Sequence, residues 1–277
     1  MTSYKSVTYL PSGKSDVVTI QYLDEGAGPV IVMLPSLARS GRDYDDVARR
    51  IIEKGYRVIR PEPRGVRGSV GPMKDLSLHD FAGDVAAVLD RENTGPVLMV
   101  GHAWGSQPAR MVAADRPDLV LALVMAAASA GKMLPGSTEK PYSRLRAEID
   151  GSGDMALSEE VRLECLRKAF FAPGHDPRVW LDGWYQEAHD AQSHARINTP
   201  IDDYFSGGRV VPILDLQAEY DAVVIPKIMK PYLGDRVTEG VVRDAGHAMA
   251  PEQPQAMCDA ICEFAERVIK HSGVGSK

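Results

Sequence analysis

Five consecutive residues near the middle of the chain have the spacing of a turn that presents a reactive side chain. The sequence Gly101-His102-Ala103-Trp104-Gly105 has the spacing of Gly-x-Ser-x-Gly and lies between an apolar run and an amphipathic segment. That motif needs glycines because a strand-to-helix turn this sharp leaves no room for flanking side chains, while the middle residue is held strained and points into a site. Here the middle residue is Ala103, whose methyl group cannot act as a nucleophile.

An aspartate and a histidine follow this turn in an order that suits acid-base chemistry. Asp221 comes shortly after the apolar run 211–216, and His247 lies in Ala245-Gly246-His247-Ala248, after the last predicted strand. A histidine oriented by a carboxylate is a common general base. Nucleophile, acid, histidine is also a known order along a chain for such a site, although Glu219 is a rival to Asp221.

Alternating strands and helices are needed to bring these residues to one edge of a sheet. The run Val30 to Leu34 is apolar throughout, as in a parallel strand buried on both faces, and Ser77 with Asp80 resembles a capping box that opens a helix. The predicted strands cover residues 17–23, 30–34, 56–59, 96–100, 119–125, 211–216 and 241–243. The predicted helices cover 43–53, a segment from Ser77, 106–115 and 253–269. This alternation predicts an α/β fold with one doubly wound, mostly parallel sheet.

Residues 129–208 interrupt the alternation and look like a helical lid inserted into a core made of residues 1–128 and 209–277. Gly, Pro, charged and aromatic residues become frequent there. Helical patterns cover 158–171 and 177–194, and turns are predicted at 151–154 and 199–203.

Together, the element order, the turn at 101–105, the turn with Asp221 and the turn with His247 resemble the α/β-hydrolase family over nearly the whole chain outside the insertion. The resemblance implies the α/β-hydrolase fold with a lid after strand six. It also implies a hydrolase site made of position 103, Asp221 and His247, with no cofactor. Asp221 is preferred to Glu219 because it stands at the family's usual offset, just before an apolar segment that ends at Pro226.

The resemblance further implies an oxyanion hole made of two backbone N–H groups. One comes from the residue after the nucleophile position, here Trp104, and the other from the loop after the third strand. The family commonly has His-Gly in that loop, whereas this chain has Pro35-Ser36-Leu37-Ala38-Arg39. We assign the second donor to Leu37.

Alanine at position 103 leaves three interpretations open. In the first, it replaces a serine or aspartate in an engineered protein. A serine would imply hydrolysis of an ester, thioester, lactone or C–C bond, whereas an aspartate would resemble epoxide hydrolases and haloalkane dehalogenases. Alternatively, alanine is natural, and His247 with Asp221 drives non-covalent chemistry: direct attack by water, a lyase or decarboxylation step, or cofactor-free oxygenation. The third interpretation is a ligand-binding protein built on the hydrolase fold.

Six further residues are candidates for the substrate pocket: Ser36, Arg39, His102, Trp180, Trp184 and Tyr185. The two tryptophans are four residues apart and would share one face of a helix, where they line an apolar pocket or hold the lid against the core. Arg39 would meet an anionic substrate or lie solvated at the surface. Ser36 would offer its hydroxyl to the site or to the loop. His102 is expected to pack and hydrogen-bond behind the site.

The bulk composition favours a small-molecule enzyme. Of the 277 residues, 44% are hydrophobic and 25% are charged, with a net charge of −6, which fits a globular protein and argues against nucleic-acid or anionic-membrane partners. The three cysteines, Cys165, Cys258 and Cys262, show no disulfide framework, and no cluster has metal-ligand spacing. We therefore expect a cytoplasmic protein with reduced thiols, without an export signal, a membrane span or a metal, and we leave a homodimer open.

Overall fold

The computed structural model describes residues 3–134, 136–138, 145–208 and 211–272 and contains one eight-stranded sheet. Its strands follow the order β1-β2-β4-β3-β5-β6-β7-β8. Their bounds are Lys5–Tyr9 (β1), Val18–Gly26 (β2), Val30–Leu34 (β3), Arg57–Pro61 (β4), Val97–His102 (β5), Val120–Ala126 (β6), Ile213–Ala218 (β7) and Val237–Val242 (β8). From β4 to β8 all neighbours pair in parallel, while β1 pairs with β2 and β2 with β4 in antiparallel. The predicted doubly wound, mostly parallel sheet is confirmed.

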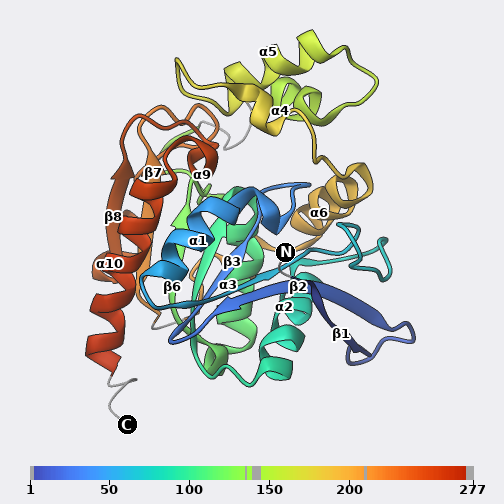
Figure 1. The fold of residues 1–277 in the computed structure, drawn as a ribbon, viewed down its shortest axis with the longest axis vertical. Coiled ribbons are helices and arrows are strands. Elements are labelled where there is room, and N and C mark those ends of the chain that lie inside the picture. Colours follow the sequence, from blue (N-terminus) through green and yellow to red (C-terminus); the bar gives the residue numbers. More distant parts are fainter. Residues whose placement is uncertain (1–2, 135, 139–144, 209–210, 273–277) are drawn as a thin grey trace.

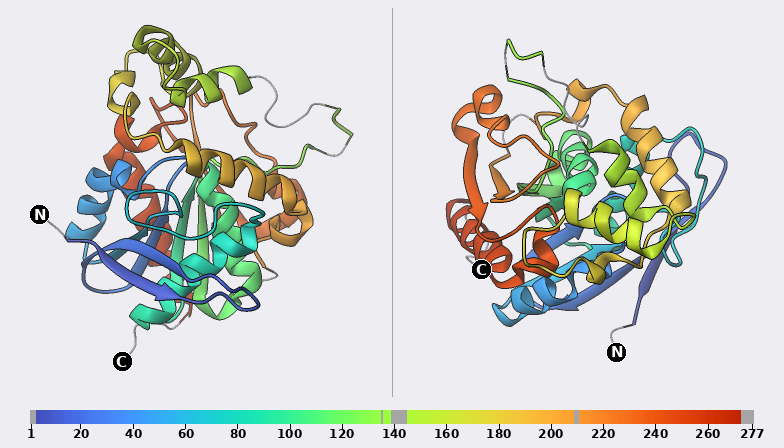
Figure 2. Two further views of the ribbon diagram at one scale, coloured as in Figure 1. Left: turned by 90° about the vertical axis from the view of Figure 1, so that its right-hand side faces the viewer. Right: turned by 90° about the horizontal axis from the view of Figure 1, so that it is seen from above.

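Long helices cover both faces of the sheet (Figures 1 and 2). Their bounds are Asp45–Glu53 (α1), Leu78–Glu92 (α2), Ser106–Asp115 (α3) and Pro254–Ser272 (α10). Successive side chains of a strand point to opposite faces, so Val32 of β3 packs in the cluster with α2 and α3, whereas Ile31 packs in the cluster with α1 and α10. Burial on both faces explains why β3 has no polar residue. The capping box between Ser77 and Asp80 is present at the start of α2.

β1 and β8 differ most from the sequence-based expectation, whereas the bounds of the other strands agree with it to within three residues. β1 was not predicted because it is an edge strand: its five residues, Lys5–Tyr9, are exposed or half-buried and carry no apolar run. β8 begins at Val237, four residues before the predicted strand at 241–243, because its alternating burial brings in polar residues that conceal its start. Neither difference moves the ends of the central strands β3 and β5.

The described residues between β6 and β7 include four α-helices. They are Arg146–Gly153 (α4), Glu159–Ala169 (α5), Gln186–Asn198 (α6) and Ile201–Tyr204 (α7). In Figure 1, α4 and α5 stand beyond one end of the sheet, and α6 lies closer to the sheet than they do. The expected boundary at residue 209 lies outside the described residues.

Three predictions within this segment were wrong. Residues 177–194 do not form one helix, because a short 3-10 helix at Pro177–Trp180 is separated from α6 by Gly183, which has a φ of +81°. Residues 151–153 belong to α4 and not to a turn; the glycines are there for close packing, since a Cβ on Gly153 would lie 2.8 Å from the Trp184 ring. The predicted turn at 199–203 runs into α7, which begins at Ile201.

Candidate active site

A sharp turn joins β5 to α3, and Ala103 lies at its apex. Ala103 has a φ of +48°, a left-handed conformation that residues other than glycine rarely adopt. A Cβ on Gly101 would lie 2.5 Å from the Cα atom of Ser106, and one on Gly105 would lie 2.4 Å from the main-chain oxygen of Leu34. Both flanking positions therefore require glycine for steric reasons, as the spacing predicts.

His247 and Asp221 meet beside this turn. The Nδ1 atom of His247 lies 3.0 and 3.1 Å from the two carboxylate oxygens of Asp221, and both side chains are 4% exposed. The backbone N–H groups of Val223 and Val224 donate to the Oδ1 atom of Asp221 and hold the carboxylate in place. Because a carboxylate accepts the Nδ1 proton, the Nε2 atom of His247 is left with a lone pair.

Glu219 does not take this position. Its carboxylate accepts hydrogen bonds from the Arg243 side chain and from the backbone N–H of Asp244, on the outside of the turn. The structure therefore brings His247 to Asp221 and not to its rival.

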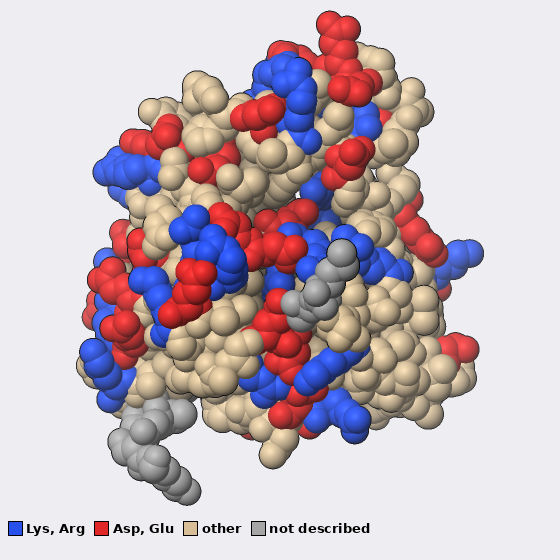
Figure 3. Space-filling model, in the orientation of Figure 1, with Lys and Arg blue, Asp and Glu red and all other residues tan. Residues whose placement is uncertain are grey.

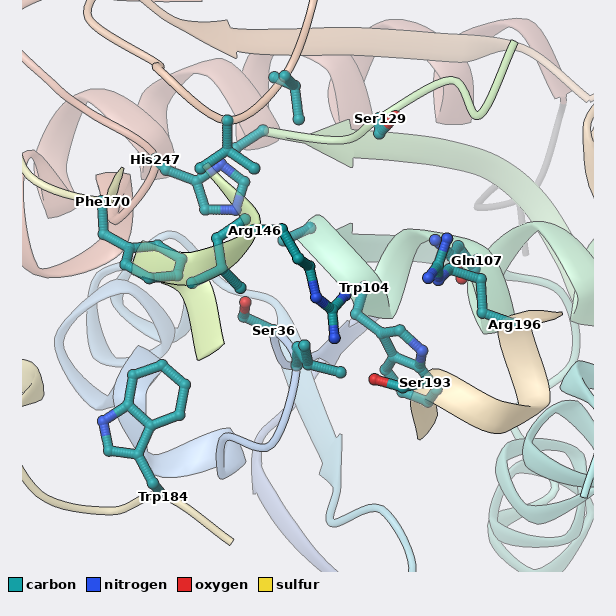
Figure 4. Close-up of a pocket in the computed structure, with 16 residues that line it drawn as sticks. Ser36, Trp104, Gln107, Ser129, Arg146, Phe170, Trp184, Ser193, Arg196 and His247 are labelled. Atoms are coloured by element: carbon teal, nitrogen blue, oxygen red, sulfur yellow. The ribbon is translucent and has the colours of Figure 1, made fainter. Parts of the chain in front are cut away.

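The turn and the histidine face one cavity of about 90 Å³. Ala103, Trp104 and His247 line it together with Ser36 and Leu37 from the loop after β3. Figure 4 shows the His247 ring and the Ser36 hydroxyl directed into this space. Since one water molecule needs about 10–15 Å³ on this measure, the cavity has room for several waters or a small organic molecule.

A buried chain of hydrogen bonds runs behind the cavity and involves His102. The Ser36 N–H donates to the Oη atom of Tyr44 at 3.2 Å, and this hydroxyl lies 2.6 Å from the Nδ1 atom of His102. The Nε2 atom of His102 lies 2.7 Å from the main-chain oxygen of His247. A carbonyl only accepts, so Nε2 carries the proton and Tyr44 donates to Nδ1. Burial, together with the nearby His247, lowers the pKa of His102 to about 3, so the ring is neutral.

Glu252, at the end of the short helix Met249–Glu252 (α9), fastens the turn that carries His247. Its two carboxylate oxygens accept hydrogen bonds from the backbone N–H groups of Gly246, at 2.7 Å, and Ala172, at 2.6 Å. Burial raises the pKa of this carboxyl. Glu252 and Tyr44 carry no signal in the sequence, because their partners are backbone groups or residues distant along the chain.

The structure places Arg39 away from the lining of the cavity, contrary to the expectation that it meets a substrate or the solvent. Its side chain is 2% exposed and forms an ion pair with Asp43 at 2.6 Å. It also donates to the main-chain oxygens of Trp180 and Asp182 and stacks over the ring of Trp184, 4.8 Å from the centroid. Arg39 therefore joins the loop after β3 to the β6–β7 segment.

The aromatic candidates separate into different environments. Trp184 lines the cavity with Phe170, whereas Trp180 does not line it and packs, 1% exposed, between the rings of Phe170 and Phe171. Tyr185 lies outside the cavity as well, and its backbone N–H donates to the main-chain oxygen of Ala38. The two tryptophans are edge-on to each other rather than on one helix face.

The described ranges show neither a metal-binding cluster nor a membrane-spanning helix. They contain no group of three or more His, Cys, Asp or Glu side chains arranged to hold a metal ion. None of the helices in the same ranges is long and apolar enough to cross a membrane. On the face drawn in Figure 3, acidic and basic side chains are mixed, without a large patch of one sign.

Comparisons with a family model, with relatives and with solved structures all indicate the same family. The family model described as alpha/beta hydrolase fold matches residues 29–254. The soluble epoxide hydrolase of Corynebacterium sp. (strain C12) is 25% identical, over 88% of this chain and 93% of that protein. The (E)-2-((N-methylformamido)methylene)succinate hydrolase of Acinetobacter baylyi is 24% identical, over 75% of this chain and 85% of that protein. Among solved structures, a bromoperoxidase from Bacillus anthracis has a TM-score of 0.74 at 20% identity, covering 95% of this chain and all of that one.

Proposed function

This chain belongs to the α/β-hydrolase fold family and is a hydrolase of that family, and on that premise we propose that it hydrolyses a small organic substrate, with an ester, lactone or C–C bond, at Ala103, Asp221 and His247. The observation that carries the proposal is the position of His247, whose ring reaches from the Asp221 carboxylate to the cavity beside Ala103. The epoxide and the substituted succinate named for two relatives are different substrates, so the likeness favours no single bond.

In the mechanism that we propose, water replaces the missing nucleophile. Ala103 has no atom that can form a covalent intermediate. The Nε2 atom of His247 takes a proton from a water molecule, the resulting hydroxide attacks the substrate carbonyl, and the protonated histidine then gives its proton to the leaving group. Asp221 accepts the hydrogen bond from the Nδ1–H group throughout and stabilises the imidazolium. Backbone N–H groups of Trp104 and Leu37 stabilise the negative oxygen of the tetrahedral intermediate.

The conformation of Ala103 favours a second candidate, in which the position is built for a nucleophile. A left-handed residue between two obligatory glycines is the backbone of a nucleophile elbow. We propose that Ala103 occupies the nucleophile position of the family, and that a serine there would hydrolyse the same substrates through an acyl enzyme. The segment 129–208 would act as the lid of this site.

Intact-mass analysis tests both routes. The unmodified chain and the Ala103→Ser variant are each incubated with 4-nitrophenyl acetate, and nitrophenolate release is followed in parallel. An acetyl adduct in Ala103→Ser alone supports the elbow assignment, and turnover by the unmodified chain without an adduct supports attack by water.

The control is the His247→Ala variant of each protein, which should abolish both signals. Full activity in a His247→Ala variant contradicts the assignment of the base. If no form of the protein shows turnover or an adduct, the hydrolase site is contradicted, and ligand binding is left as the function of the cavity.

A further inference from the structure

The cavity beside His247 combines an apolar wall with two arginines. Arg146, the first residue of α4, and Arg196, near the end of α6, both line it. Within the described part of the chain, no aspartate or glutamate belongs to the lining. The described part of the lining therefore contributes two cationic side chains and no anionic one.

The two arginines reach the cavity from different helices. Figure 4 shows the guanidinium of Arg146 extending into the space between Ser36 and Trp104, and it shows Arg196 with Gln107 at the end away from His247. The Nε atom of Arg146 donates to the Oδ2 atom of Asp150 one turn along α4, at 2.7 Å. That ion pair is exposed and occupies one N–H group of the guanidinium, which has further N–H groups on its other edges.

Gln107 supplies an independent sign that a polar ligand belongs here. Its side chain lines the cavity from the first turn of α3 and is 4% exposed, yet its Oε1 atom has no hydrogen-bond partner among the described residues. A buried polar atom without a partner costs free energy, and a bound polar molecule removes that cost. The amide offers a donor and an acceptor of nearly the same shape, so a simple rotation lets it donate to a negative oxygen.

We propose that the substrate of this site is a small organic acid, bound through a carboxylate held by Arg196 and Gln107, with Arg146 as a second cationic contact. A guanidinium presents N–H groups in a fork that matches both oxygens of a carboxylate. The start of α3 adds the positive end of the helix dipole at the same place. Val223, Val224 and Phe170 face the carbon skeleton, and the bond to be cleaved then lies near His247. This inference rests on the proposed function because it names the substrate class of the same site.

A binding measurement tests the proposal without requiring turnover. NMR titration of the unmodified chain at low ionic strength compares succinate with succinamide, which has nearly the same shape but no charge. The Arg196→Gln and Arg146→Gln variants are titrated in the same way. The matched control is Arg167→Gln, because Arg167 lies on α5, is about half exposed like Arg146, and does not line the cavity.

We expect the unmodified chain and Arg167→Gln to bind succinate alike, and succinamide to bind at least about tenfold more weakly. Arg196→Gln and Arg146→Gln should each lose at least about tenfold in affinity for succinate, as expected when a charge-assisted hydrogen bond is removed. Thermal melting shows whether each variant is folded, and the comparison of the two ligands needs no variant. Equal binding of succinate and succinamide, undiminished binding by Arg196→Gln, or no binding by the unmodified chain overturns the proposal. Because no step depends on catalysis, succinate binding by a chain that shows neither turnover nor an adduct, as itself or as Ala103→Ser, contradicts the proposed hydrolysis alone.

Discussion

The Nε2 atom of His102 donates a hydrogen bond to the main-chain oxygen of His247 across 2.7 Å. This bond ties the β5–α3 turn to the turn that carries His247. The two residues are 145 positions apart in the chain. The other nitrogen of the His102 ring lies against Tyr44, which in turn accepts from the backbone N–H of Ser36. A single neutral ring thus aligns three loops around the cavity, and no part of it needs to touch a substrate.

Replacing His102 with phenylalanine should therefore destabilise the fold. The change leaves the Tyr44 hydroxyl and the His247 carbonyl buried without that partner, and each such loss costs about 1–3 kcal/mol. We expect the free energy of unfolding in urea to fall by about 2–4 kcal/mol. The same substitution at the exposed His194 on α6 is the control and should change stability by less than about 0.5 kcal/mol. Equal effects at the two positions would show that the buried hydrogen bonds contribute little.

The parts of the site that the sequence predicts are those with a local signal. Gly101 and Gly105 are required by the closeness of neighbouring backbone atoms, and that requirement appears directly as spacing. Asp221 and His247 each follow a strand of a parallel sheet, and the carboxyl ends of parallel strands meet at one edge. Their encounter therefore follows from the order of the elements.

The parts that the sequence does not predict depend on distant backbone groups. Arg39 looks like a surface charge, but the carbonyls that it binds belong to Trp180 and Asp182, more than 140 positions away. Glu252 has the same character, since one of its two partners is the N–H of Ala172. The break before α6 did have a signal: Asp182-Gly183 is a dipeptide typical of turns, and helical periodicity concealed it.

Arg39 and Asp43 should show strong energetic coupling. Arg39→Met leaves the Asp43 carboxylate, whose pKa is already raised by burial, without its ion-pair partner. Breaking one partner of a buried pair costs about 3–5 kcal/mol, so we expect a loss of stability in that range. The double variant Arg39→Met, Asp43→Asn removes the stranded charge and should lose at least about 1 kcal/mol less than the sum of the single variants. Urea unfolding of the four proteins gives the coupling, and additivity within about 0.5 kcal/mol would contradict a buried ion pair.

Asp215 should make stability depend on pH. Burial in β7 raises the pKa of its carboxyl from 3.8 to about 6, although the Gln217 side chain donates to it. A raised pKa means that the folded chain holds a proton which the unfolded chain releases, so this contribution to stability is full below pH 3.8 and is lost as the pH rises through 6. Asp215→Asn has no charge to bury and keeps an acceptor for Gln217.

We therefore expect Asp215→Asn to gain stability relative to the unmodified chain as the pH rises from 4 to 7, by up to about 3 kcal/mol. Thermal and urea unfolding at pH 4, 5, 6, 7 and 8 measure the difference between the two proteins. A difference that stays constant across this range would mean that the carboxyl titrates alike in the folded and unfolded chains.

Ala103 should be less favourable for stability than glycine. A left-handed conformation costs an alanine about 1–2 kcal/mol, and Ala103 adopts one with a φ of +48°. Glycine adopts it freely but loses more chain entropy on folding, by about 0.4–1 kcal/mol. We expect Ala103→Gly to raise the free energy of unfolding by up to about 1 kcal/mol, as measured in urea.

The matched control for that change is Ala109→Gly in the buried middle of α3, which should lower stability by about 1 kcal/mol or more because glycine is unfavourable in a helix. Opposite signs at positions 103 and 109 would establish that the elbow is strained in the folded chain. Strain of this kind is retained where surrounding structure enforces it for a purpose, and a turn that merely connects β5 to α3 has no need of it. If Ala103→Gly instead destabilises the protein as much as Ala109→Gly, the conformation at 103 is relaxed, and the turn stores no strain that would point to a nucleophile position.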